Sequence, residues 1–399
     1  MAVACLTKKF IMKVIISLLK PIIIIFSLVI ILFNVGLIVY TQSSRYTSTS
    51  FWENFPTLKH AYVNSQYVSK HPLGWIPDES VNAYAAGAYI QGVSPILIAP
   101  DTPPLGRYLI GLSALLFNNE NVIILISGIG SLVMMYLLGM QIFKRHDLAL
   151  IAPAFVSFEP FFLNQFIYTP LLDIMQLFFL LITFYFFNLA LVTKKKKIIF
   201  FLLTNFFLGC FIATKFYITG ITVVAAFVVT LLILRRFKDI ILYGFTVSLA
   251  VLVLLLSYVR VLFDHYPLLK FLGIQKYVFV YHKSQLMYPF SVWDLLLFNK
   301  WHVWFGNSPV ISDGQWRISW PLVTISTFGT GILLLVKKVK LTLQILPLLV
   351  WVVLYLLFSS VGQISSRYFI IMLPIMYIVT VYFFVQLLQM LYTKKEKKK

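Results

Sequence analysis

The sequence predicts an all-α integral membrane protein, a polytopic bundle of about ten transmembrane helices with two long extracytoplasmic loops. Three observations lead to this fold class. Of the 399 residues, 60% are hydrophobic and only 12% are charged, whereas soluble domains are about a quarter charged. Apolar runs of about twenty residues recur, and each can cross a hydrocarbon core as a helix. Short clusters of Lys and Arg separate these runs at alternate turns, as the positive-inside rule requires.

The first predicted span follows a basic N-terminal segment and ends near Tyr40. Its apolar stretch is too long for the core of a signal peptide, and no small-residue cleavage site follows, so we expect an uncleaved span. An outer loop, 41–121, comes next, and a second outer loop, 263–319, follows the seventh span. The other predicted spans are Val122–Phe143, Leu148–Ile167, Pro170–Val192, Ile198–Ala213, Phe216–Leu234, Ile240–Leu262, Trp320–Val336, Leu341–Phe358 and Phe369–Tyr392. Residues 1–399 are treated as one transmembrane domain.

The basic clusters predict the orientation of the chain. A formal net charge of +20 would suit a nucleic-acid partner, but the cations lie between apolar runs, chiefly at Lys144-Arg145, Lys194–Lys197, Arg235-Arg236 and Lys394–Lys399. We therefore expect both termini in the cytoplasm and no nucleic-acid partner. The membrane would be the cell membrane in a prokaryote and the endoplasmic reticulum membrane in a eukaryote. The two cysteines, at positions 5 and 210, are predicted neither to pair nor to build a metal cluster.

The first outer loop carries the strongest functional signal, at Asp78-Glu79. A carboxylate held at a membrane surface can accept the proton of a hydroxyl during group transfer. A solvated acidic turn is the alternative, since surface acids are common. A short helix is predicted over residues 80–91, with both acids at its N-terminal end, where the helix dipole stabilises ionised carboxylates.

The same loop continues with Asp101-Thr102-Pro103-Pro104-Leu105-Gly106-Arg107. The Pro pair cannot continue a helix backward, so a helix is expected to begin at Leu105. Leu105–Phe117 is short for a span and is predicted to lie on the outer leaflet as an interfacial or re-entrant helix. Arg107, a cation beside apolar surface, can hold a phosphate bidentately. Alternatively, Arg107 extends to the lipid headgroups.

Four more ionisable residues lie near predicted outer ends of spans: Glu159, Asp173, Lys215 and Arg367. Ionisable residues inside a membrane are costly and usually functional, but near a span end they can simply cap or anchor the helix.

The outer histidines have no short helical spacing that would predict a metal site. We therefore predict no resident cofactor and leave a requirement for a divalent metal open. An interfacial aromatic belt is predicted for Trp293, Trp301, Trp304, Trp316 and Trp320, with sugar stacking as the alternative.

Five motifs follow one another between Trp52 and Pro374. They are Asp78-Glu79 with Asp101-x-Pro-Pro-Leu-Gly-Arg107; Leu171-Leu172-Asp173; Gly209 with Thr214-Lys215-Phe216; Tyr281-His282 with Tyr288-Pro289-Phe290-Ser291-Val292-Trp293; and Ser366-Arg367-Tyr368 with Pro374. In this order they resemble the protein O-mannosyltransferases and related GT-C glycosyltransferases. The chain departs from that family at four positions. Thr102 stands where the family has His, Arg107 where Lys is usual, Tyr168 near a common Arg, and Tyr288 in place of His.

The resemblance implies a GT-C bundle that moves mannose or a similar hexose from a polyprenyl-phosphate donor to a hydroxyl acceptor. The acceptor would be a protein, a lipid or a glycan at the extracytoplasmic face, and the reaction an inverting single displacement. Asp78 would be the base and Glu79 would orient it or the acceptor, while the substrate-binding residues would be Asp101, Pro103, Pro104, Arg107, Asp173, Lys215, His282, Arg367 and Tyr368. The lipid-linked sugar is then a co-substrate within the membrane lipids. The alternative is a polytopic transporter or flippase for lipid-linked saccharides, which would place acids in mid-span and broken helices in paired positions.

Overall fold

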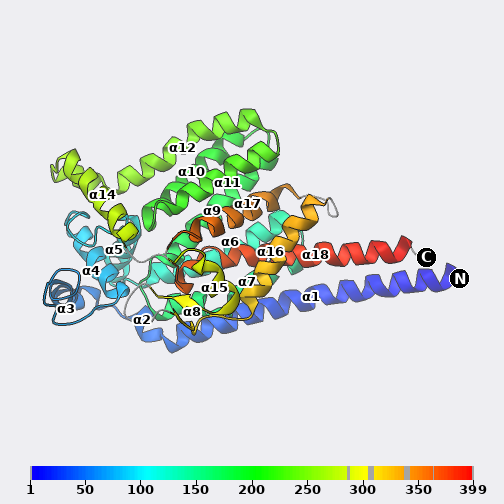
Figure 1. Cartoon of the computed structure of the whole chain (residues 1–399). Coiled ribbons are helices and arrows are strands. Elements are labelled where there is room, and N and C mark those ends of the chain that lie inside the picture. The colour runs from blue at the N-terminus through cyan, green and yellow to red at the C-terminus, as the bar shows by residue number, and fades with distance from the viewer. Residues whose placement is uncertain (1, 285–287, 304–309, 337–341, 363, 398–399) are drawn as a thin grey trace.

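The protein is almost entirely helical in a computed structural model that describes residues 2–284, 288–303, 310–336, 342–362 and 364–397 (Figure 1). Its helices are α1 (Ala2–Thr41), α2 (Ser43–Thr47), α3 (Phe51–Val63), α4 (Asp78–Ile90), α5 (Leu105–Phe117), α6 (Val122–Phe143), α7 (His146–Val156), α8 (Pro160–Ile167), α9 (Asp173–Val192), α10 (Lys197–Thr214), α11 (Thr219–Ile233), α12 (Phe237–Ser257), α13 (Val259–Phe263), α14 (Leu268–Ser284), α15 (Ser291–Phe298), α16 (Ser319–Leu335), η1 (Leu343–Ile345), α17 (Leu346–Ser359), η2 (Ser366–Ile370) and α18 (Leu373–Lys397). Strands β1 (Trp301–His302) and β2 (Val310–Ile311) form a short antiparallel pair.

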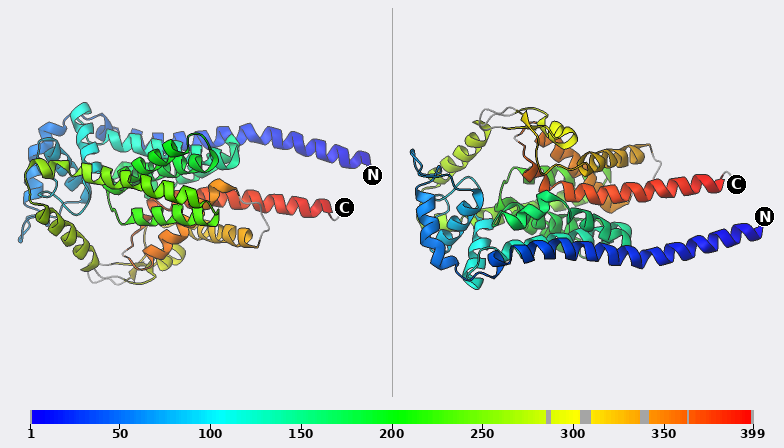
Figure 2. Two further views of the ribbon diagram at one scale, coloured as in Figure 1. Left: turned by 90° about the horizontal axis from the view of Figure 1, so that it is seen from above. Right: turned by 90° about the horizontal axis from the view of Figure 1, so that it is seen from below.

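The long helices lie side by side in one elongated bundle. Both termini lie at one end of it, whereas α3, α4, α5 and α14 lie at the opposite end, here termed the loop end (Figures 1 and 2). The two predicted outer loops therefore contribute helices to the same end of the molecule, away from the termini.

The predicted spans correspond to helices, with one correction. Six helices are long and apolar enough to cross a membrane: residues 19–41 of α1, α6, α9, α10, α12 and residues 373–391 of α18. The predicted span Leu148–Ile167 is wrong as a single straight helix, because α7 and α8 are bent by 64° at the break between them. Pro160 is the first residue of α8, and proline cannot donate the hydrogen bond that would continue α7.

A multi-pass membrane protein is thus confirmed, although the number of spans is not. Helices α11, α16 and α17 coincide with predicted spans but have only 15, 17 and 14 residues. A helix needs about twenty residues to cross the hydrocarbon core without tilt or thinning of the bilayer. The count of about ten spans stays a prediction.

Helix α9 lies at the centre of the bundle and is buried on almost every side, packing against α6 and α10. Aromatic rings fill the space beside it. The rings of Phe187 and Phe227 stack at 3.8 Å, and Phe184 meets Trp351 edge to face at 5.6 Å. In lipid, such van der Waals packing holds helices together, because the hydrocarbon chains are as apolar as the side chains. The first residue of α9, Asp173, is thereby fixed in position.

The first outer loop folds as the sequence predicted. Helix α4 begins at Asp78 and α5 begins directly after Pro104. One face of α5 is buried, while Leu115, Leu116 and Phe117 are exposed. An exposed apolar face on a short helix is typical of an interfacial helix, and the position of α5 on the outer leaflet stays a prediction.

One tryptophan of the predicted aromatic belt is not at the surface. Trp320 is fully buried and its Nε1 donates to Glu159 at 3.0 Å, so the belt prediction is wrong for this residue. Trp293 and Trp301 donate to Ser360 Oγ and to the Ile364 carbonyl at 2.9 and 2.8 Å. These two rings attach the second loop to the segment between α17 and η2, whereas Trp304 lies outside the described residues.

Candidate active site

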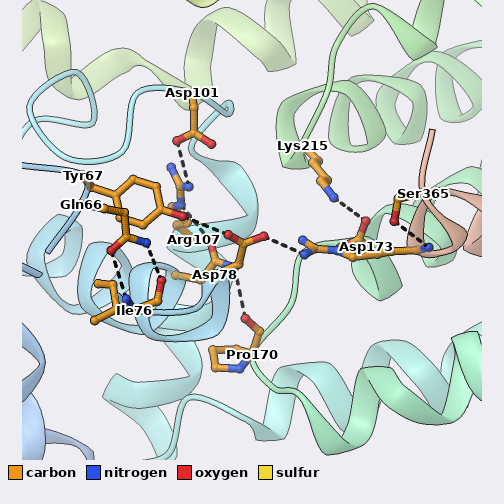
Figure 3. A network of polar contacts seen from close by, with 12 residues as sticks. Gln66, Tyr67, Ile76, Asp78, Asp101, Arg107, Pro170, Asp173, Lys215 and Ser365 are labelled. Carbon is orange, nitrogen blue, oxygen red and sulfur yellow. Dashed lines mark hydrogen bonds and ion pairs between the residues drawn. The ribbon is translucent and has the colours of Figure 1, made fainter. Parts of the chain in front are cut away.

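Four charged residues from four distant segments meet beside the first turns of α4 and α9: Asp78, Asp173, Lys215 and Arg367. Figure 3 labels the first three. Arg367, in η2, joins the two acids: its Nη1 donates to Asp78 Oδ2 at 2.6 Å and its Nε donates to Asp173 Oδ2 at 2.7 Å. Lys215, which follows α10, donates from Nζ to Asp173 Oδ1. The network contains two carboxylates and two cations, so its charges balance.

The sequence places each of these residues at the end of a helix. Asp78 and Asp173 are the first residues of α4 and α9, where the positive end of the helix dipole stabilises a carboxylate. In η2, the Ser365 hydroxyl accepts a hydrogen bond from the backbone N–H of Arg367 at 3.3 Å. This cap fixes the start of the turn that carries the guanidinium.

The two acids differ in their access to solvent. The side chain of Asp173 is only 3% exposed, whereas that of Asp78 is 49% exposed. A buried carboxylate is stable only when it is paired, and Asp173 has both cations as partners. Asp173 therefore holds Lys215 and Arg367 in position. Asp78 instead accepts a hydrogen bond from the Tyr67 hydroxyl at 3.2 Å. Because it is half-exposed, Asp78 can also contact a group that arrives from water.

Electrostatics keep Asp78 ionised. Burial raises the pKa of its carboxyl, but the Arg367 guanidinium and the Lys215 ammonium together lower it, and the pKa lies below the ordinary value for an aspartate. Asp78 and Asp173 in turn hold the pKa of Arg367 above its ordinary value despite burial. At neutral pH, Asp78 is therefore a carboxylate, and it becomes a stronger base if Arg367 moves away.

Arg107 lies in the interior rather than in the network. Its guanidinium is 3% exposed and donates to the Ala99 carbonyl, to Asn82 Oδ1 at 3.2 Å and to Asp101 Oδ1 at 3.4 Å. The Asn82 amide also donates to the Pro170 carbonyl at 3.2 Å. These contacts tie α4 and α5 to the segment before α9, and a phosphate-binding role for Arg107 stays a prediction without structural support.

Gly106 lets the first turn of α5 approach the network closely. A Cβ atom here would lie 2.8 Å from Leu172 Cδ2 and 3.0 Å from the Thr214 carbonyl oxygen. Those two residues directly precede Asp173 and Lys215. Pro103 and Pro104 are buried beside this contact, so the loop fixes the spacing between the two charged residues.

A cavity of about 300 Å³ opens beside Asp173 and Lys215. Its wall is mainly apolar and includes Phe216, Ile218, Phe279, Tyr355, Phe358, Val361, Ile364, Tyr368, Ile370 and Ile371. Its polar residues include Thr102 and Gln176. Lys215 Nζ lies 5.2 Å from the centre of the Tyr368 ring. A cavity with apolar walls and a cation in its lining suits an amphiphile with an anionic head.

Comparison with known proteins identifies the fold. The profile of the dolichyl-phosphate-mannose-protein mannosyltransferase family matches residues 101–259, less than half of the chain. No curated protein sequence matches significantly. The apo crystal structure of ArnT from Cupriavidus metallidurans is similar at a TM-score of 0.53 and 14% identity, over 77% of this chain and 54% of ArnT. A second similar structure is the archaeal oligosaccharyltransferase AglB from Archaeoglobus fulgidus, in complex with an inhibitory peptide and a dolichol-phosphate. The TM-score is 0.53 and the identity 14%, over 94% of this chain and 52% of AglB. Both are GT-C glycosyltransferases.

This chain has the GT-C fold. The resemblance that the motifs indicated is confirmed, although the chain spans only about half the length of the two solved structures. The family match begins at Asp101, so Asp78 and Glu79 lie outside it. The transporter alternative finds no support in these comparisons. Transporters of this kind typically have a broken helix at corresponding positions in each half of the chain. The described residues contain one broken helix of this size, α7 with α8.

The GT-C fold brings together five of the predicted site residues: Asp78, Asp173, Lys215, Arg367 and Tyr368. Glu79 is the second residue of α4, and its side chain makes no hydrogen bond or ion pair to another described residue. His282 lies in α14, and its side chain is outside the described ones. The described residues contain no group of three or more His, Cys, Asp or Glu side chains that could hold a metal ion. The roles of the individual residues remain predictions.

Two residues of the candidate site escaped the sequence analysis. Asn82 connects α4 to Arg107 and to the segment before α9. The sequence feature that could have identified it is a polar residue one turn after Asp78, on the same face of the helix. Gln176 lines the cavity one turn after Asp173. An uncharged polar residue in an apolar run is a weaker signal than a charge.

Proposed function

We propose that this protein is a membrane glycosyltransferase that moves a sugar from a polyprenyl-phosphate donor to a hydroxyl acceptor. The observation that carries the proposal is a half-exposed carboxylate, Asp78, linked through Arg367 to the charged residues in the lining of an apolar cavity. A base near a bound lipid phosphate is the arrangement that glycosyl transfer from such a donor requires.

The cavity supports a lipid-linked donor. Its apolar wall suits an isoprenoid chain, and Lys215 in its lining suits a phosphate. The family profile and the AglB complex point to the same class of donor, since the first is described by dolichyl-phosphate-mannose and the second contains a dolichol-phosphate. Mannose or a similar hexose is the sugar we propose, and the acceptor is a hydroxyl of a protein, a lipid or a glycan.

The proposed reaction is a single displacement with inversion at the anomeric carbon. The acceptor oxygen attacks this carbon and its proton passes to Asp78. The bond from the anomeric carbon to the phosphate oxygen breaks, and its electron pair stays on the phosphate. The transition state is oxocarbenium-like, so positive charge develops on the sugar near Asp78 while negative charge develops near Lys215 and Arg367.

Arg367 couples donor binding to the base. Its guanidinium is shared by Asp78 and Asp173. A phosphate beside Lys215 competes for the same N–H groups, because charge-assisted bonds to phosphate are among the strongest that Arg makes. Asp78 then loses part of its cationic partner and its pKa rises, so the base becomes stronger only once the donor is present.

The function is tested by direct transfer assays with purified protein in lipid. Incubation with polyprenyl-phosphate sugars carrying labelled mannose, glucose or another hexose is expected to label a hydroxyl acceptor, whereas labelled nucleotide sugars are not. Membranes without the protein provide the control. Transfer from nucleotide sugars alone, or from no lipid-linked sugar, contradicts the proposal.

The orientation of the chain is part of the proposal, with both termini in the cytoplasm and the loop end outside. The measurement uses a chain in which Cys5 and Cys210 are replaced by Ala, with Leu73→Cys in the first loop and Lys195→Cys between α9 and α10 as probes. Both positions are exposed. A membrane-impermeant thiol reagent added from outside is expected to label Leu73→Cys but not Lys195→Cys in intact cells or right-side-out vesicles. The reverse pattern would place Asp78 on the cytoplasmic face and contradict the mechanism.

A further inference from the structure

Two buried polar atoms in the cavity have no hydrogen-bond partner among the described residues. Gln176 Nε2 and Thr102 Oγ1 each expose almost no surface, and neither makes a hydrogen bond to any described residue. The Gln176 side chain is almost completely buried, with 4% of the residue exposed. Buried polar groups without partners are rare because they lose their bonds to water without replacement. Because both atoms border one cavity and neither bonds to a described residue, a ligand in the cavity can be their partner.

The position of the two atoms limits what that partner can be. Gln176 lies one helical turn after Asp173, so both residues share a face of α9. Thr102 precedes the buried Pro pair, and both residues line the cavity with Lys215. An amide N–H, a hydroxyl and an ammonium therefore border the same space.

The chemistry of this space is that of an anion site. All three groups can donate hydrogen bonds, while the two carboxylate oxygens of Asp173 already accept from Lys215 and Arg367. The ligand that suits several donors is a group with several acceptor oxygens, and a phosphate has them. A sugar hydroxyl would instead need both donors and acceptors.

We infer that Gln176 and Thr102 bind the phosphate oxygens of a lipid phosphate alongside Lys215. This inference rests on the proposed function and adds two residues to it. Neutral donors suit this position, because Lys215 and Arg367 are already balanced by Asp173 and Asp78, and a further buried cation would be unpaired until a phosphate binds. Thr102 stands where the resembling family has His, so the hydroxyl contact belongs to this chain.

The test measures binding rather than transfer. The purified full chain in lipid nanodiscs is titrated with a radiolabelled short-chain polyprenyl phosphate and, separately, with the polyprenol of the same length. Loss of a hydrogen bond to a charged group typically weakens binding about ten-fold or more. We expect Gln176→Leu and Thr102→Val each to weaken polyprenyl phosphate binding by this factor and to leave polyprenol binding unchanged. Thr102→Ser, which keeps the hydroxyl, should retain the affinity of the wild type for polyprenyl phosphate.

Matched controls separate this contact from a general effect on folding. Gln165 and Thr230 are also buried and have an unpartnered side-chain oxygen, but they do not line the cavity. Gln165→Leu and Thr230→Val are expected to bind the lipid phosphate like the wild type. Monodisperse elution of every variant confirms folding.

Three outcomes would overturn the inference. The first is unchanged polyprenyl phosphate binding in folded Gln176→Leu and Thr102→Val. The second is a loss of polyprenol binding as large as the loss of polyprenyl phosphate binding, which would show that the substitutions only change the shape of the cavity. The third is competition by inorganic phosphate as strong as that by the lipid, which would assign the cavity to free phosphate. Because binding needs no turnover, a protein that binds lipid phosphate through Gln176 but transfers no sugar would contradict the proposed function alone.

Discussion

Asp78→Asn is expected to lower the rate of sugar transfer by about 10² to 10⁴-fold, the usual effect of removing a general base. The amide keeps the size of the carboxylate and can still accept a hydrogen bond from Arg367, but it cannot take the acceptor proton. The protein should fold, because the Asp78 side chain is 49% exposed. Affinity for polyprenyl phosphate should be retained or increased, since Lys215 and the cavity are unchanged and Arg367 no longer pairs with an anionic Asp78.

The measurement is labelled-sugar transfer by purified protein at saturating donor. Glu79→Gln should reduce transfer less, because its predicted task is orientation. Glu53→Gln alters an exposed acid of the same loop and should leave the rate unchanged. An Asp78→Asn protein that transfers at near-normal rate would remove the main support for this loop as the active site.

Arg367→Ala is expected to weaken donor use by about ten-fold or more, as for the loss of a charged hydrogen bond, and to shift the pH dependence of transfer. The guanidinium holds the pKa of Asp78 below its ordinary value. Without it that pKa rises, so at mildly acidic pH more Asp78 is protonated and inactive. The acidic limb of the pH profile of kcat/KM for the donor, which reports the protein before donor binds, should therefore move to higher pH.

Arg367→Lys should fall between the wild type and Arg367→Ala. A Lys keeps the charge but lacks the planar fork that reaches two carboxylates at once. Arg317→Ala is the matched control, since Arg317 is exposed and bonds to backbone carbonyls of its own loop. If both Arg367 variants show wild-type donor KM and an unshifted acidic limb, Arg367 only anchors η2.

Much of the fold was predictable because lipid imposes simple rules on a chain. Apolar length predicted the spans, and the Pro pair predicted the start of α5 at Leu105. The bend between α7 and α8 was not predictable from apolar length, since both sides of Pro160 are equally apolar. Glu159 fills that break, where it accepts bonds from Ser319 Oγ at 2.6 Å and from Trp320. Such distant partners leave no local signal.

The site was predictable residue by residue but not as a network. Charges near span ends pointed to Asp173, Lys215 and Arg367, because ionisable residues are costly in a membrane. Nothing in the sequence states that Arg367 pairs with Asp78, which lies 289 residues away. The sequence also cannot reveal whether a guanidinium faces inward, and Arg107 is buried where a surface cation was expected.

The separation of the paired charges has a consequence for biosynthesis. Asp173 and Lys215 lie 42 residues apart and enter the membrane early, whereas Arg367 lies 194 residues after Asp173. While the later helices are being made, the buried carboxylate has one cation instead of two, and Asp78 has no guanidinium partner. The nascent chain therefore completes its charge pairing only when η2 emerges. A product that terminates before Arg367 would display an imperfectly paired carboxylate to the quality-control machinery of the membrane.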